Sequence, residues 1–216
     1  MTYTLHSMWR ATAPYRVRIG LNLKGLAYNY AAVDLAGGEQ RGARYREVNP
    51  QGLAPALDIG DRVLTQSLAI LEWLEETHPE PALLPKDPLD RAVVRAMAEI
   101  VACDIHPLNN LRVLQAIEVL GVAGGSDEQR AWVHRWIGAG FDALEPMIQR
   151  HGEGFAFGVQ PGLADCCLIP QVYSANRFRL DLAPYPAIKA VAERAADHPA
   201  FAAAHPDKQP DAPPLP

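Results

Sequence analysis

The first third of the chain alternates between short apolar runs and segments whose apolar residues lie on one side of a helix. Strand-like runs bounded by turn residues occur at residues 2–6, 28–33, 53–58 and 63–64. Apolar residues at helical spacing occur at residues 14–24, 41–47 and 67–77. The order β-α-β, a short helix, then β-β-α predicts a small mixed domain.

Prolines and small residues mark the ends of these elements. We expect Pro14 to be the first residue of its helix, where its missing N–H costs nothing, and Gly25 to end that helix. Ser67 is expected to cap the last of the three helices. Pro55 falls inside the third strand and removes a ladder donor. It is tolerated if that strand lies at an edge, or if the peptide from Ala54 is cis and the backbone there faces a ligand.

After Thr77 the strand patterns disappear and helical patterns fill the rest of the chain. A proline-marked linker at 78–85 is followed by a helical run over 90–120 bent near Pro107, helices opening at Ser126 and Pro161, and closing helices at 186–196 and 199–204. The helix after Pro161 is apolar nearly all round, so we expect it to be central and buried. Trp132, Trp136 and Phe141 are expected in the core. We therefore predict a domain over 1–80, an all-helical domain over 88–205, and a flexible tail over 206–216.

Composition and charge exclude several classes of protein. The chain has 216 residues, 49% of them hydrophobic, and a net charge of −5, which argues against a nucleic-acid partner. No apolar run is long enough to span a membrane, and the N-terminus does not resemble a secretory signal, so we expect a cytoplasmic protein. Cys103, Cys166 and Cys167 suit neither a disulfide nor a metal site, and we interpret them as reduced core residues.

Residues 9–18 form the most informative stretch. Arg10, Thr12 and Pro14 lie where the first strand turns into the first helix, which is where α/β proteins place anion sites. Taken alone, Thr12 is explained equally by a helix cap, and Arg10 is better explained by a surface salt bridge.

Three motifs spread over both domains resemble the cytosolic glutathione transferases. Residues 53–57 (Leu-Ala-Pro-Ala-Leu) resemble that family's cis-proline strand, Gln66 and Ser67 resemble its γ-glutamyl site, and residues 162–165 resemble the capping box of its core helix. The resemblance implies an α+β two-domain glutathione-transferase fold, with an N-terminal thioredoxin-like βαβ-ββα domain and a C-terminal all-α domain.

More narrowly, the chain resembles the zeta class, the maleylpyruvate and maleylacetoacetate isomerases. The segments that carry this resemblance are residues 9–19, 66–76, 103–110 and 175–186. It implies a glutathione-dependent cis-trans isomerase that converts a maleyl keto acid to its fumaryl form by reversible thiolate addition, in aromatic-compound catabolism. It also implies a homodimer whose substrate is a small unsaturated dicarboxylate.

The resemblance assigns roles residue by residue. Thr12 and Arg10 would be catalytic, with Thr12 holding the glutathione thiolate. The expected glutathione contacts are Thr12, Gln51, Ala54, Pro55, Gln66, Ser67, Asp104, His106 and Asn110, with Asp104 and Asn110 reaching it across a dimer interface. The expected substrate contacts are Arg10, Arg112 and Arg177. An arginine on a buried helix must be paired, so Arg177 either grips a substrate carboxylate or pairs with an acid such as Asp181.

The chain also departs from the zeta pattern. Ala11 stands where the class usually has Ser, Ala13 where it has Cys or Thr, and Gly162 where the core helix usually has a Thr cap. These departures leave two alternatives open. One is another glutathione-dependent reaction, such as conjugation, dehalogenation or peroxide reduction, and the other is a non-catalytic glutathione-binding module.

Overall fold

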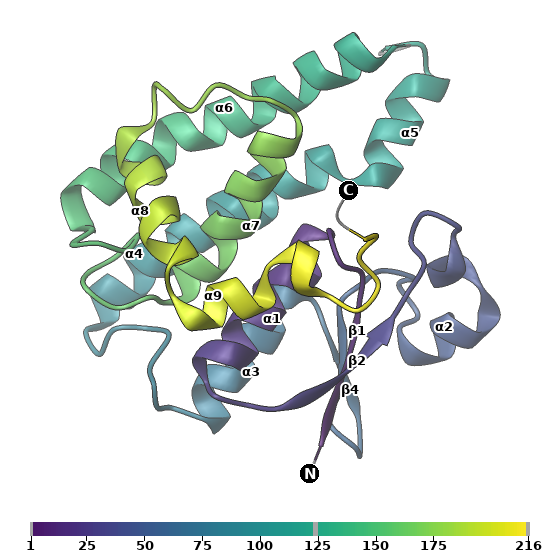
Figure 1. Cartoon of the computed structure of the whole chain (residues 1–216), viewed down its shortest axis with the longest axis horizontal. Helices are drawn as coiled ribbons and strands as arrows, with labels where there is room; N and C mark the ends of the chain where they lie inside the picture. Colours follow the sequence, from purple (N-terminus) through teal and green to yellow (C-terminus); the bar gives the residue numbers. More distant parts are fainter. Residues whose placement is uncertain (1, 123–124, 215–216) are drawn as a thin grey trace. The chain divides into compact units, whose positions relative to one another are not determined.

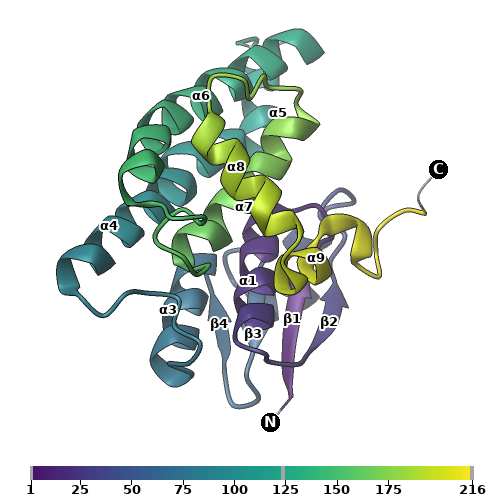
Figure 2. The same ribbon diagram turned by 60° about the vertical axis from the view of Figure 1, so that its left-hand side comes forward.

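The computed structural model describes residues 2–122 and 125–214. They form two compact units, Met1–Leu83 with Ala196–Pro216 and Leu84–Ala195. Figures 1 and 2 show a sheet flanked by helices in the first unit and helices alone in the second. The expected βαβ-ββα arrangement and the expected helical region are both seen. No helix in the described ranges combines the length and the apolar character needed to cross a bilayer.

The first unit is built on a four-stranded mixed sheet in the order β2-β1-β3-β4. Its strands are β1 (Tyr3–Ser7), β2 (Tyr28–Ala32), β3 (Ala56–Asp58) and β4 (Val63–Thr65). β1 runs parallel to β2 and antiparallel to β3, and β3 is antiparallel to β4. The parallel strands β1 and β2 are joined through a helix, and the antiparallel strands β3 and β4 by a short turn, as these two kinds of pairing require.

Helices α1 (Thr12–Leu23) and α3 (Ser67–Thr77) pack against each other, while α2 (Ala43–Val48) follows β2. Gly20 lies at the α1–α3 contact, where an added Cβ would come within 2.2 Å of a Leu71 methyl group. Leu5, Leu57 and Ile70 are fully buried in the core. A residue without a side chain at position 20 therefore lets the two helices approach closely.

The element starts differ from the predictions in three places. α1 begins at Thr12, two residues before Pro14, and tolerates the proline because the first N–H groups of a helix have no partner within it. α3 is preceded by Gln66 as its N-cap, so Ser67 is the first helical residue and not the cap. β3 begins at Ala56, directly after a cis Ala54–Pro55 peptide, so Pro55 lies outside the strand.

The C-terminal segment belongs to the first unit. Helix α9 (Pro199–Ala204) packs along α1, as both ribbon views show, and a short 3₁₀ turn follows at Pro206–Lys208. The expectation of a flexible tail does not describe residues 206–212. Gln209 is buried and donates to the carbonyl oxygens of Ala203 and His205 at 3.0 and 2.8 Å. Composition suggested disorder, but prolines also stiffen a chain that finds partners.

The second unit is helical, with helices α4 (Pro88–Glu99), α5 (Leu111–Val119), α6 (Ser126–His151), α7 (Leu163–Arg177) and α8 (Pro186–Ala196). The run predicted over 90–120 is broken, not merely bent. A π-helical segment at Ile100–Ile105 and a 3₁₀ turn at His106–Asn109 separate α4 from α5. Pro107 lacks the N–H that a continuous helix needs, and the Asn110 side chain caps the new helix by accepting from Arg112 N at 3.1 Å.

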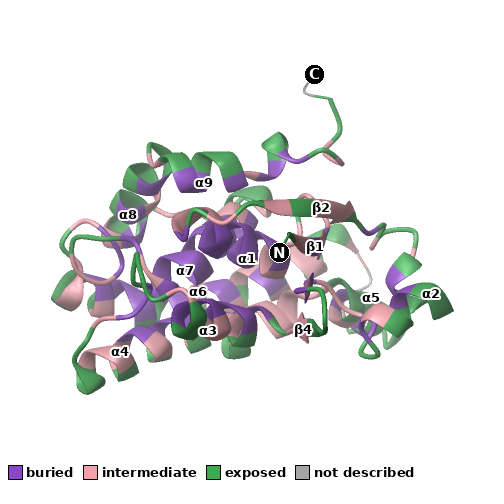
Figure 3. Cartoon of the chain, turned by 90° about the horizontal axis from the view of Figure 1, so that it is seen from below, coloured by how far each residue is buried: buried purple, intermediate pink, exposed green. Residues whose placement is uncertain are grey.

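Helix α7 is the buried centre of this unit, and Figure 3 shows it mostly in the colour of buried residues. Cys166 and Cys167 lie in its core, as expected, but Cys103 is exposed, which corrects its assignment to the core. Phe141 is fully buried, whereas Trp132 and Trp136 are only half-buried. Gly162 has no side chain to cap the helix, so Asp165 makes the cap alone by accepting from Gly162 N at 2.9 Å and Ala156 N at 2.8 Å.

Candidate active site

Strand register brings three of the predicted site segments to one end of the sheet. His6 pairs with Ala56, and Ala56 pairs with Thr65. The residues just beyond this row are Ser7 at the end of β1, Pro55 before β3, and Gln66 after β4. Because β1 is antiparallel to β3 and β3 to β4, all three residues lie at the same end of the strands. We call this end of the sheet the site edge. The chain leaves that edge through the turn that precedes α1 and through the start of α3.

Two helix N-termini meet this edge. α1 spans 12 residues and follows β1 after a short turn, and α3 spans 11 residues and follows β4 after Gln66 alone. The unpaired N–H groups of a helix start carry partial positive charge. The Arg16 side chain of α1 joins the two helices by donating to the Ser67 hydroxyl at 3.2 Å. The edge is therefore suited to an anion.

The Thr12 hydroxyl is available at this edge. Thr12 is the first residue of α1, is half-buried, and makes no hydrogen bond through its side chain within the described ranges. The N-cap is Ala11, which has an extended backbone (φ −72°, ψ 127°) and no side chain that caps the helix. The capping role that was an alternative for Thr12 therefore has no support in the structure.

Buried contacts fix the backbone before Thr12. The Arg18 guanidinium is fully buried and donates to the carbonyl oxygens of Trp9 at 2.8 Å and Met8 at 3.4 Å, and to the Ser7 hydroxyl at 3.1 Å. Burial lowers the pKa of Arg18 from its usual value, but a guanidinium stays charged in proteins. Arg10 is exposed and lies over the Trp9 ring, with its Cζ 5.5 Å from the ring centroid.

The segment before Pro55 offers an open backbone edge. The N–H and C=O of Ala54 have no backbone partner in the described part of the chain, and Leu53 O accepts from Tyr45 at 2.9 Å and Asn49 at 2.6 Å. An extended peptide ligand can therefore pair with Ala54 as an added strand does. Beside it, Gln66 has a positive φ of 66° and donates to the Gln51 side chain at 2.7 Å.

Gln40 is a neighbour of this edge that the sequence pattern did not reveal. It is buried, its Nε2 donates to Leu35 O at 3.3 Å, and its Oε1 has no partner among the described residues. The backbone carbonyl oxygen of Gln40 lies 2.9 Å from the position that a Cβ on Gly52 would take. No apolar period marks a single buried amide in a glycine-rich loop, so only the folded chain identifies it.

The remaining predicted residues belong to the second unit. His106 lies in the 3₁₀ turn and Asn110 caps α5, while Asp104 and Arg112 are exposed. Arg177 is the last residue of α7 and is exposed, with its Cζ 4.8 Å from the Phe178 ring centroid. The premise that Arg177 is buried is therefore wrong, because the helix leaves the core at its C-terminal end.

Comparisons with known proteins agree with this geometry. Residues 13–77 match the family model of the glutathione S-transferase N-terminal domain. The chain is 50% identical to maleylpyruvate isomerase from a Ralstonia species, over 96% of this chain and 98% of that protein. It is 48% identical to maleylacetoacetate isomerase from Pseudomonas aeruginosa, over 97% and 98% of the two chains.

A solved holo structure of a bacterial zeta-class maleylpyruvate isomerase superposes with a TM-score of 0.95, at 48% identity, over 97% of this chain and 100% of that chain. The chain belongs to the zeta class of glutathione transferases. The maleylacetoacetate isomerase of Anaeromyxobacter dehalogenans, solved with glutathione in its active site, superposes with a TM-score of 0.88 at 47% identity, over 98% of both chains. Within this class, Ala11 and Ala13 leave Thr12 as the only hydroxyl between Met8 and Pro14.

Proposed function

We propose that this protein is a glutathione-dependent isomerase that converts maleylpyruvate or maleylacetoacetate to the fumaryl form in the cytoplasmic breakdown of aromatic compounds. The observation that carries the proposal is the strand register of a zeta-class chain, which brings the end of β1 before the Thr12 turn, the segment before Pro55 and Gln66 to one end of the sheet. An anion site, an open backbone edge and a hydroxyl donor are what a tripeptide thiolate requires.

The edge fits glutathione residue by residue. The unpaired backbone of Ala54, held before the cis peptide to Pro55, would pair with the cysteinyl residue. Gln66 and Ser67 at the N-terminus of α3 would hold the γ-glutamyl carboxylate, and Gln51 would extend this contact. In the homodimer that we propose, Asp104 and Asn110 would reach the glutathione of the other subunit, and His106 would be a further glutathione contact.

When bound, glutathione supplies the thiolate that adds reversibly to the maleyl double bond, so that the bond can rotate before the thiolate leaves. A free thiol has a pKa of about 8.5, so the protein must favour the anion. Thr12 would donate a hydrogen bond to the sulfur, and the N-terminus of α1 would add its partial positive charge. Neither role needs a general base.

The arginines would hold the substrate by its carboxylates. Arg10 lies exposed in the same turn as Thr12 and would bind one carboxylate beside the sulfur. Arg177 and Arg112 are exposed cations of the second unit and would bind the other. A guanidinium suits this task because it offers two parallel N–H donors to a carboxylate.

Isomerase assays test the proposal directly. Purified protein is mixed with maleylpyruvate or maleylacetoacetate, and the loss of the cis enol absorbance is followed with and without glutathione. We expect turnover of at least one substrate only when glutathione is present. Turnover of neither substrate would contradict the proposal.

The departures at Ala11 and Ala13 favour one second candidate, another glutathione-dependent reaction on the same site. If glutathione binds and ionises but neither maleyl substrate reacts, conjugation, dehalogenation and peroxide reduction are assayed next. A bound thiol with an unshifted pKa would instead indicate a binding module without chemistry.

A further inference from the structure

We propose that Asp211, near the C-terminus, is a positioning residue that holds the turn Met8–Thr12 in its working conformation. The inference rests on the proposed role of that turn in binding thiolate and substrate. Residues 205–211 run from the end of α9 to the β1–α1 turn, and we call this segment the C-terminal strap.

The Asp211 carboxylate joins two distant parts of the first unit. Its Oδ2 accepts from the backbone N–H of Trp9 at 2.9 Å, and its Oδ1 accepts from the Tyr30 hydroxyl of β2 at 2.7 Å. Trp9 lies more than 200 residues earlier in the chain. Both carboxylate oxygens are used, and a charged acceptor makes a stronger hydrogen bond than a neutral one.

Arg18 holds the carbonyl group of the same residue. It donates to Trp9 O at 2.8 Å, so the N–H of Trp9 is fixed by the strap and its C=O by α1. The same guanidinium donates through Nε to Ala204 O at 3.0 Å, at the end of α9 where the strap begins. The strap and the turn therefore share one buried cation.

The strap arrives at Trp9 in a defined conformation. The Gln209 side chain folds back on the carbonyl oxygens of Ala203 and His205, and Ala212 N donates to Gln209 O at 3.0 Å. Pro206 and Pro210 each fix one φ angle. Little conformational freedom remains between Ala204 and Asp211. Ordering this segment so that the Asp211 carboxylate reaches Trp9 therefore costs little conformational entropy.

Fixing both polar groups of Trp9 constrains the residues after it. Arg10 is the next residue, and Thr12 begins the helix two residues later. A small shift of a catalytic group can lower a rate by up to about a hundredfold, so a carboxylate that touches no reactant can still control the reaction.

The test compares Asp211→Ala and Asp211→Asn with a matched tail variant, Asp207→Asn, whose carboxylate oxygen lies 3.6 Å from the ring nitrogen Nδ1 of His205 and not against the Trp9 peptide. In glutathione-free protein, we expect Asp211→Ala to speed amide hydrogen exchange in the 8–12 turn about tenfold or more, as loss of a hydrogen bond to a charged acceptor implies. With glutathione, kcat should fall about tenfold and the pKa of the bound thiol should rise. Asp211→Asn keeps one oxygen acceptor, so its amide exchange rate and its kcat should stay within about threefold of the wild-type values. The same is expected of Asp207→Asn.

The outcomes separate positioning from other roles. Wild-type exchange and kcat in Asp211→Ala would overturn the proposal. So would a lower melting temperature with unchanged exchange in the turn, which indicates a merely structural role. Equal losses in Asp211→Ala and Asp211→Asn with a lowered thiol pKa would also overturn it, because they indicate a role of charge. The exchange measurement needs no glutathione, so it decides this proposal even if the wild-type protein isomerises neither maleyl substrate.

Discussion

Thr12 carries the only hydroxyl between Met8 and Pro14, at the start of a helix that has no side-chain cap. The four other side chains in this interval carry no hydroxyl; they are those of Trp9, Arg10, Ala11 and Ala13. If a side-chain hydroxyl of this turn stabilises the thiolate, it must be that of Thr12.

We therefore expect Thr12→Ala to lower kcat at least about tenfold, the effect of losing one hydrogen bond to an anion in the transition state. Thr12→Ser should retain most of the activity because it keeps the hydroxyl. Isomerase kinetics and the pKa of the bound thiol measure both variants. Thr77→Ala is the control, since that hydroxyl lies at the C-terminal end of α3, where it contacts Trp73 O and His78 Nδ1. An unchanged kcat in Thr12→Ala would shift the role to the N–H groups of α1 and to Arg10.

Arg177 is exposed at the end of α7, so its substitution should affect substrate binding and not the stability of the core. Arg177→Ala should mainly raise KM for the maleyl substrate, about tenfold, because the interaction is made before and during the reaction alike. Arg194→Ala is the matched control, since Arg194 is also exposed and stacks on an aromatic ring, Phe155, at 5.2 Å. Equal KM values for Arg177→Ala and wild type would remove Arg177 from the substrate site.

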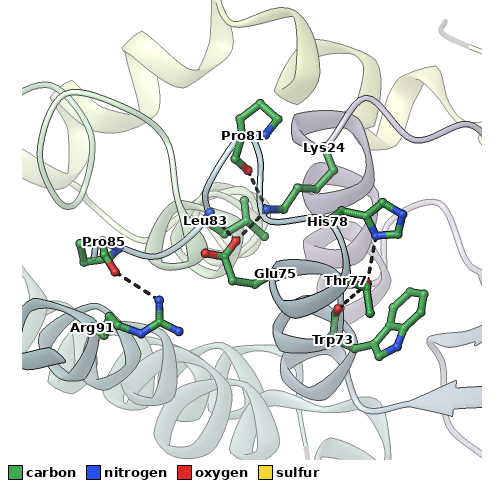
Figure 4. Close-up of polar contacts among 9 residues, drawn as sticks. All are labelled: Lys24, Trp73, Glu75, Thr77, His78, Pro81, Leu83, Pro85 and Arg91. Atoms are coloured by element: carbon green, nitrogen blue, oxygen red, sulfur yellow. Dashed lines mark hydrogen bonds and ion pairs between the residues drawn. The ribbon is translucent and has the colours of Figure 1, made fainter. Parts of the chain in front are cut away.

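Among the elements, the linker after α3 is held by a buried ion pair, drawn in Figure 4. Lys24 Nζ lies 2.7 Å from Glu75 Oε2 and 2.6 Å from Pro81 O, and Glu75 Oε2 also accepts from Leu83 N at 2.7 Å. One ion pair thus joins the end of α1, the last turns of α3 and the linker of the first unit. Each charge lies out of water and depends on the other.

Lys24→Met alone should lower the free energy of unfolding by about 3–5 kcal/mol, because it leaves the Glu75 carboxylate buried without its cation. The double variant Lys24→Met, Glu75→Leu should recover much of this loss. Denaturant unfolding measures the cycle, and Lys189→Met, which breaks only the exposed pair with Glu193, should change stability by less than about 1 kcal/mol. Additive single losses in the double variant would contradict the coupling.

At the scale of the whole molecule, one buried acid makes stability depend on pH. Burial raises the pKa of Asp165 from 3.8 to about 6, although hydrogen bonds from backbone N–H groups, among them those of Ala156 and Gly162, act in the opposite direction. The folded protein therefore binds more protons than the unfolded chain between these values. The stability from this group is fully present below about pH 4 and is lost as the pH rises through about 6.

Asp165→Asn cannot titrate, so it isolates this contribution. The stability of the wild type relative to Asp165→Asn should fall between about pH 4 and pH 6 and then stay constant up to about pH 8. Urea unfolding at a series of pH values measures the difference, in which the other titrating groups cancel. A difference that is constant from pH 4 upward would show that the pKa of Asp165 is not raised.

The predicted elements differ from the structure mostly at their ends. Residues 186–196 and 199–204 form helices with the predicted bounds, because proline starts each and the apolar spacing is regular. The start of α1 at Thr12 and the N-cap of α3 at Gln66 were missed since the first turn of a helix accepts proline or serine at several positions. The interruption between Ile100 and Asn110 was underestimated because its apolar spacing stays close to helical.

In the candidate site too, some residues were predicted from short motifs and others depend on the folded chain. Residues 66 and 67 and the proline at 55 were identified from motifs that combine special residue types in short stretches. Gln40 was missed because its burial depends on the fold of a loop around it. Arg177 was misjudged because apolar periodicity locates a buried helix but not the residue at which it leaves the core.

Local pattern predicted the class of most elements, because spacing and turn chemistry act over a few residues. The motifs at residues 9–19, 66–76, 103–110 and 175–186 carried the resemblance to the zeta class. Tertiary structure decided which distant groups meet. It brought Asp211 to the N–H of Trp9, and it placed the Arg18 guanidinium against the Trp9 carbonyl. No periodicity encodes a contact across 200 residues, since such a contact forms only when α9 packs along α1 and delivers the strap to the turn.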